Sequence, residues 1–192
     1  MVTAGLLLPF SIRLMPTLAL ALLLAGRANA GAETLIRSID IVQDADAYVA
    51  NAVMFAPVPA SIAWEVLTDF DHMAAWVPNV RESKVIAREA DTVTVEQQGV
   101  AKFGLVTLPY TSVRQLQLDA QRTVRSTQIK GSMRRFESLM TLTPDGKGTQ
   151  LNYHLEMVPA GLAAAALSKD FLKHELTEQF SAIIEEMARR SR

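Results

Sequence analysis

The sequence contains no cysteine, which excludes disulfides, cysteine nucleophiles, iron–sulfur clusters and zinc–cysteine sites. Aromatic residues make up only 6% of the 192 residues. Neither sign of charge dominates, because 19 basic and 20 acidic side chains leave a net charge of -1. A protein that neutralises nucleic-acid phosphates needs a basic surface, so this balance argues against a nucleic-acid partner.

Motifs of the common enzyme classes are also missing. The chain has no G-x-S-x-G elbow, phosphate-binding loop or dinucleotide fingerprint. Its three histidines, His72, His154 and His174, are far apart in the chain, and none has another histidine at helical spacing. The sequence therefore predicts no catalytic residue, no metal site and no cofactor.

The first thirty residues differ from the rest. Arg13 precedes an apolar run over residues 14–25, and a Gly-Arg-Ala-Asn-Ala segment follows. A charged start, an apolar centre and a small-x-small end are typical of a secretory signal peptide. A membrane anchor is the alternative, but a spanning helix needs about 20 apolar residues. We expect residues 1–30 to be removed after Ala30, which would place the protein in the periplasm or outside the cell.

Residues 31–192 show no repeat and no linker, which indicates a single domain large enough to bury a core without disulfides. Residues 48–56 predict a strand, and residues 60–70 and 71–75 predict two short helices. Alternation of apolar and polar residues then predicts six more strands. These strands cover residues 83–88, 92–103, 106–118, 123–129, 134–143 and 150–158.

After Pro159 the apolar residues recur every three or four positions, which predicts one amphipathic helix of up to about thirty residues. A seven-stranded antiparallel sheet cannot bury both faces by itself, so it must curl around this helix. The expected fold is therefore α+β, a helix-grip fold. A sheet that grips a helix leaves space between the two, where an apolar ligand can bind.

Four stretches, together with this order of elements, resemble START-like proteins of the SRPBCC superfamily, on the polyketide cyclase/dehydrase and coenzyme Q-binding branch. They are residues 55–70 (FAPVPASIAWEVLTDF), 76–83 (WVPNVRES), 130–138 (KGSMRRFES) and 148–153 (GTQLNY). The resemblance covers about residues 45–190 and implies a START-like fold with a hydrophobic cavity. It also implies binding of a lipid, quinone or polyketide-like molecule, and it supplies no catalytic motif.

One charged residue lies on an apolar strand face. Residues 106, 108, 110, 116 and 118 form that face, and Arg114 shares their parity. Removing an ion from water costs several kcal/mol, so an inward Arg114 needs a carboxylate, a ligand head group or a route to solvent. A β-bulge near Pro109 that reverses the parity is the alternative. Gln97 and Tyr153 also share parity with apolar neighbours.

These patterns predict a carrier or binding protein for a hydrophobic small molecule. The residues expected to contact the ligand are Trp76, Pro78, Gln97, Phe103, Tyr110, Arg114, Phe136, Tyr153 and Phe171. A cyclase or dehydratase acting in the same cavity is the enzymatic alternative, and an interaction module with a filled cavity is a third. The Arg134–Arg135 pair and the C-terminal arginines allow transient contact with anionic lipid. The sequence does not predict an oligomeric state.

Overall fold

The structure is a computed structural model and describes residues 35–192. The expected signal peptide and its cleavage site lie outside the described residues. The strands are β1 (Ile36–Asp44), β2 (Ala47–Ala56), β3 (Val80–Glu89), β4 (Thr92–Phe103), β5 (Val106–Asp119), β6 (Thr123–Gly131), β7 (Met133–Asp145) and β8 (Gly148–Pro159). The helices are α2 (Ala60–Thr68), the 3-10 helix η1 (Phe70–Ala75), α3 (Gly161–Ala166) and α4 (Lys169–Arg190).

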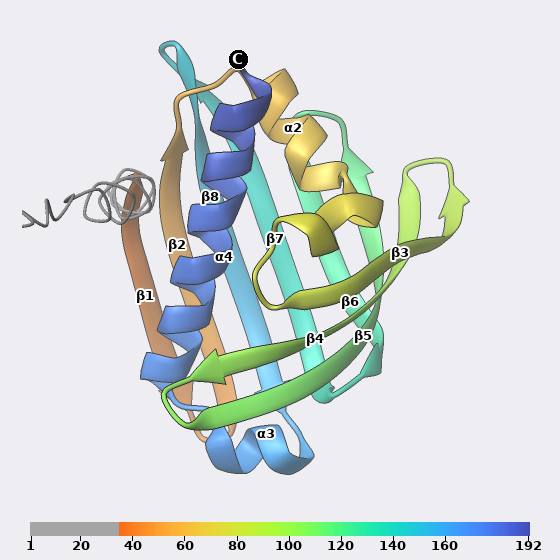
Figure 1. Cartoon of the computed structure of the whole chain (residues 1–192), viewed down its shortest axis with the longest axis vertical. Coiled ribbons are helices and arrows are strands. Elements are labelled where there is room, and N and C mark those ends of the chain that lie inside the picture. Colours follow the sequence, from red (N-terminus) through yellow and green to blue (C-terminus); the bar gives the residue numbers. More distant parts are fainter. Residues whose placement is uncertain (1–34) are drawn as a thin grey trace, which may run out of the picture.

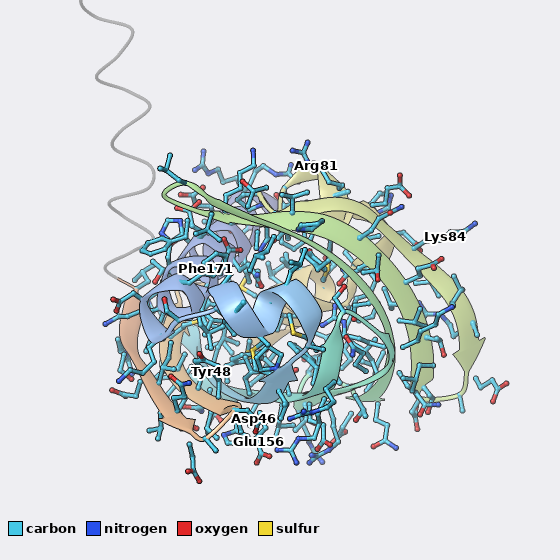
Figure 2. The ribbon with its side chains drawn as sticks, turned by 90° about the horizontal axis from the view of Figure 1, so that it is seen from below. Asp46, Tyr48, Arg81, Lys84, Glu156 and Phe171 are labelled. Carbon is cyan, nitrogen blue, oxygen red and sulfur yellow. The ribbon has the colours of Figure 1, made fainter. Side chains whose placement is uncertain are left out.

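All the strands belong to one antiparallel sheet with the order β1-β2-β8-β7-β6-β5-β4-β3. The sheet curves around α4, with α2 near the C-terminal end of that helix and α3 at the opposite end (Figure 1). Seen from the α3 end, the sheet wraps around the helices in a broad arc (Figure 2). This arrangement confirms the predicted helix-grip fold.

The sheet has eight strands rather than the predicted seven, because β1 was not expected. This strand carries only a few apolar residues, and Ile39 and Ile41 pack against the core. An irregularity in the pairing with β2 between Ile36 and Ser38 shifts the register. The bulge reverses the alternation that identifies a half-buried strand, so β1 has no clear period of two.

The predicted continuous C-terminal helix is wrong in one respect, because the segment is divided into α3 and α4. Leu167 and Ser168 are both extended, with φ/ψ of -72°/133° and -131°/169°. The side chain of Ser168 accepts a hydrogen bond from the backbone N–H of Phe171 at 3.1 Å. Serine is a favoured N-cap residue, so Ser168 begins a new helix instead of continuing the first.

Helix α4 provides the second layer of the core. It lies against β1, β2, β4 and α2. Phe180, Ile184 and Met187 of α4 are each 3% exposed or less and pack with buried residues of β2 and β8. Burial of such side chains contributes roughly 1.5–3 kcal/mol each, so the packing of α4 is a large part of the stability of the fold.

A network of ion pairs fixes the C-terminal end of α4 to α2. Arg190 Nε lies 2.7 Å from Glu186 Oε1, and Arg190 Nη2 lies 2.5 Å from Asp69 Oδ2. A third contact joins Arg190 to Glu65 at 3.1 Å. Hydrogen bonds from Arg189 and Arg190 hold the pKa of the buried Glu186 carboxyl below its usual value. Burial raises the pKa of Asp69, but hydrogen bonds from His72 and Arg190 outweigh it and leave the pKa lowered.

We predict that Glu186→Gln lowers the free energy of unfolding at neutral pH by roughly 1–3 kcal/mol, the size of a hydrogen bond to a charged group. Because the Glu186 pKa is lower in the folded protein than in the unfolded one, its carboxylate stabilises the fold at pH values above the unfolded pKa. This stabilisation is lost as the pH falls through the folded pKa. The ordinary pKa of Glu186 is 4.5. As the pH falls below this value, the variant should therefore lose less stability than the wild type. Urea unfolding at several pH values measures this.

The matched control is Glu178→Gln, because Glu178 is exposed on the same helix. Equal acid sensitivity of the wild type and Glu186→Gln would contradict the prediction.

Candidate functional site

A cavity of about 280 Å³ lies between the inner face of the sheet and the two C-terminal helices. Its wall is mostly apolar. The apolar lining includes Phe70, Leu116, Met140, Leu155, Phe171 and Phe180. Polar side chains from the strands line it as well, among them Gln97, Tyr110, Ser112, Arg114, Ser126, Gln128, Ser138 and Tyr153. A mainly apolar cavity with a few polar groups is typical of a site for a small amphiphilic molecule.

The sheet itself opens toward the α3 end of the cavity. Strands β6 and β7 pair only between residues Thr123–Thr127 of β6 and residues 137–141 of β7. Beyond that point Gln128, Ser132 and Met133 line the cavity together with Ala163 and Leu167 of the α3 segment. Helix α3 crosses this end of the sheet (Figure 2).

Arg114 lines this cavity, as its parity predicted. The pairing of β4 with β5 has no register shift from Thr92 to Phe103, so Pro109 does not reverse the alternation. The irregularity lies in the pairing with β6, where Val113 faces Lys130 and Arg114 faces Gln128. The extra residue of that bulge is therefore Ile129 of β6, and β5 keeps its inward positions.

The guanidinium of Arg114 meets neutral groups. It donates to the side-chain oxygen of Gln97, and its carbon Cζ lies 5.8 Å from the ring centre of Phe136. The side-chain nitrogen of Gln97 in turn donates to Ser83 Oγ at 2.9 Å and contacts Met73 Sδ at 3.4 Å. Arg114 Nε is buried and has no hydrogen-bond partner. Ser126 Oγ, on the wall of the same cavity, is also buried and unpartnered.

Two tyrosines flank Arg114. Burial raises the pKa of Tyr110 to about 12, and the positive charge of Arg114 offsets this only in part. Burial also raises the pKa of Tyr153, against the smaller effects of the Ser138 hydroxyl and Arg114. Both phenols are therefore neutral near pH 7 and act as hydrogen-bond donors rather than as bases. Burial lowers the pKa of Arg114, but arginine stays protonated in proteins.

Glu175 is a site residue that the sequence analysis missed. It is 8% exposed and lines the cavity from α4. Its carboxylate accepts from Asn79 Nδ2 at 2.6 Å and from the backbone N–H of Lys102 at 2.9 Å. These bonds fix the N-terminal part of α4 to the turn before β3 and to β4. A carboxylate four residues after Phe171, on the apolar face of the helix, was the available signal.

A glycine permits the close packing beside Glu175. A Cβ atom on Gly99 would lie 2.0 Å from the carbonyl oxygen of Asn79 and 2.6 Å from the hydroxyl of Tyr110. No side chain fits there without moving the backbone. Tyr110 donates a 3.3 Å hydrogen bond to that same carbonyl oxygen. Gly99 thus lets β4, β5 and the turn before β3 meet at one point of the cavity wall.

The structure brings together most of the residues predicted to contact a ligand. Six of them line the cavity, and they are Gln97, Tyr110, Arg114, Phe136, Tyr153 and Phe171. Trp76 and Pro78 lie elsewhere, in a more polar depression beside η1, and Trp76 packs against the edge of the core. Phe103 stacks against Phe171 and His174, with ring centres 5.8 Å and 5.1 Å apart, and is not part of the cavity wall.

Four of the five arginines considered for lipid contact form ion pairs. Arg134 pairs with Asp46, and Arg135 with Glu156 at 3.0 Å. Arg189 and Arg190 belong to the Glu186 network. Among residues 35–192, no helix combines the length and apolar character needed to cross a membrane. Within the same residues, no group of three or more histidine, aspartate or glutamate side chains is arranged to hold a metal ion.

The comparisons with known proteins agree with this geometry. The family model described as polyketide cyclase / dehydrase and lipid transport matches residues 49–192. A solved structure from Thermus thermophilus superposes with a TM-score of 0.64 at 17% identity, covering 74% of this chain and 98% of that one. No curated protein matches the chain.

Two further solved structures carry descriptive names. The Zhui aromatase/cyclase from a Streptomyces species has a TM-score of 0.63 at 20% identity, covering 76% of this chain and 96% of that one. A STAR-related lipid transfer protein from Xanthomonas axonopodis has a TM-score of 0.53 at 16% identity, covering 73% and 96%. At these identities the likeness shows the shared fold.

We predict that Arg114→Met leaves the free energy of unfolding of the ligand-free protein unchanged or raises it by about 1 kcal/mol. A buried charge without an opposite charge destabilises the fold. Replacing it with a hydrophobic residue of similar volume removes this cost. Chemical denaturation measures the change, with Arg125→Met on the exposed side of β6 as the control. A loss of more than about 2 kcal/mol would mean that Arg114 supports the fold.

Proposed function

The chain belongs to the polyketide cyclase/dehydrase and lipid transport family, and we propose that it binds and carries a hydrophobic small molecule in the cavity between the sheet and α4. The observation that carries this proposal is the apolar cavity of about 280 Å³ with polar groups gathered around Arg114. Apolar contact would supply most of the affinity, at about 25 cal/mol for each Å² of ligand surface removed from water. Arg114, Gln97 and Tyr153 would hold one polar end.

Several observations favour binding over the enzymatic alternative. The raised pKa values of Tyr110 and Tyr153 leave both phenols protonated, so neither is suited to remove a proton near neutral pH. Glu175 is the carboxylate on the cavity wall, and its oxygens accept hydrogen bonds from Asn79 and Lys102. The groups that face the cavity are suited to orient a ligand. The open volume also weighs against an interaction module with a filled cavity.

Ala163→Trp should weaken the binding of a neutral apolar fluorescent probe such as N-phenyl-1-naphthylamine by at least tenfold. Ala163 is 9% exposed and lines the cavity from α3, so an indole at this position would occupy the space that the probe needs. A tenfold change corresponds to about 1.4 kcal/mol. Fluorescence titration measures the affinity, and circular dichroism checks that the variant is folded.

Ala165→Trp is the matched control, because Ala165 is exposed on the same short helix and is not part of the wall. The proposal would be wrong if both variants bound the probe as the wild type does, or if the wild type bound no apolar probe.

We also propose that the protein is exported. The apolar run of residues 14–25 and the small residues up to Ala30 support this proposal. Native mass spectrometry of the protein purified from the cell envelope of its own host should give the mass of a chain that starts at Gly31. It should also show a bound apolar molecule at one per chain. An intact Met1 would contradict export, and an empty protein would contradict stoichiometric loading.

A further inference from the structure

Arg114 is a cation without a counter-ion on the wall of the cavity. Among residues 35–192, no carboxylate forms an ion pair with it. Its contacts are the amide of Gln97 and the ring of Phe136, and its buried Nε–H donates to nothing. Arginine in a protein interior is normally paired with a carboxylate or phosphate, because its planar guanidinium matches those anions. The wall therefore holds a positive charge that the chain does not balance.

The groups around Arg114 do not supply the missing negative charge. Tyr110 and Tyr153 lie beside it on β5 and β8. Tyrosine is protonated near neutral pH, and burial raises the pKa of both further. Ser126, Ser138 and Gln97 are neutral. The other charged residue of the wall is Glu175 on α4, whose two oxygens accept from Asn79 and Lys102 rather than from Arg114. None of these groups on the cavity wall therefore balances the positive charge of Arg114.

A lysine or histidine in this position could lose its proton, but an arginine cannot shed its charge near neutral pH. The ligand is then the remaining source of an anion. The buried Nε–H of Arg114 and the hydroxyl of Ser126 are both without partners, and Tyr153 lies on the same wall. Such donors suit an acceptor-only group with several lone pairs, such as a carboxylate.

We propose that the ligand is an amphiphile with a carboxylate head and an apolar body, and that Arg114 binds the carboxylate while the apolar wall encloses the body. This inference rests on the proposed function, because it names the class of molecule that the same cavity takes. A neutral quinone or ketone would accept hydrogen bonds from Arg114 but would leave its charge uncompensated. The site should therefore discriminate between ligands by charge at equal size.

The experiment compares three probes that have the same ten-carbon chain length: decanoate, decanamide and decanol. Calorimetry on the full-length mature protein at neutral pH, below the concentration at which decanoate forms micelles, gives each affinity. We expect the wild type to bind decanoate at least tenfold more tightly than decanamide or decanol. Arg114→Met should remove this preference and bind decanol as the wild type does, and Arg114→Lys should retain part of it. Arg125→Met, which changes an exposed arginine on β6, should behave as the wild type.

The outcomes separate the two proposals. Binding of all three probes with equal affinity, or tighter binding of the neutral probes, would overturn the carboxylate inference and leave the carrier function in place. Binding of none of them, with no binding of other apolar probes, would overturn both. The wild-type comparison decides the inference even if an Arg114 variant fails to fold.

Discussion

At one end of α4, the guanidinium of Arg190 joins Glu186 of the helix to Glu65 and Asp69 of the α2 segment. Near the other end, the carboxylate of Glu175 joins the helix to Asn79 and to the backbone of Lys102. Between these two anchors the apolar face of α4 packs on the sheet. A single helix that covers a large sheet must be held at both ends, because a shift of either end would open or close the space beneath it.

The cavity follows from the mismatch between one helix and eight strands. Helix α4 lies closest to β1, β2 and β4, while the cavity lies between α4 and residues of β5, β6 and β7. Protein interiors are otherwise close-packed, so a volume of about 280 Å³ between the layers is maintained by the curvature of the sheet rather than filled. At the α3 end, Gln128 of β6, Met133 of β7 and Leu167, which lies between α3 and α4, all line this volume.

Arg114, on the wall of that cavity, departs from the pattern of burial and charge pairing in the rest of the chain. The core is mainly apolar, and surface arginines such as Arg135 pair with carboxylates, yet Arg114 lies on an apolar face among neutral groups. Local conflicts of this kind in an otherwise consistent sequence concentrate at functional sites. The tyrosines beside it, kept neutral by burial, leave its charge available to a bound molecule. The site is in this sense prepared for a ligand of opposite charge.

The sequence by itself determined the helix-grip fold, since alternation and helical spacing are local signals. The parity of β5 indicated an inward Arg114, and the regular pairing of β4 with β5 then excluded the alternative of a bulge near Pro109. The tertiary structure alone decided the rest. Strand β1 is stabilised by its pairing with β2 across a bulge, and Ser168 divides the C-terminal helix. Glu175 became a site residue only when α4 met Asn79 and Lys102, and Trp76 and Phe103 came to lie outside the cavity. The pairing of β1, the bonds of Glu175 and the positions of Trp76 and Phe103 depend on contacts between residues far apart in the chain, which local patterns do not determine.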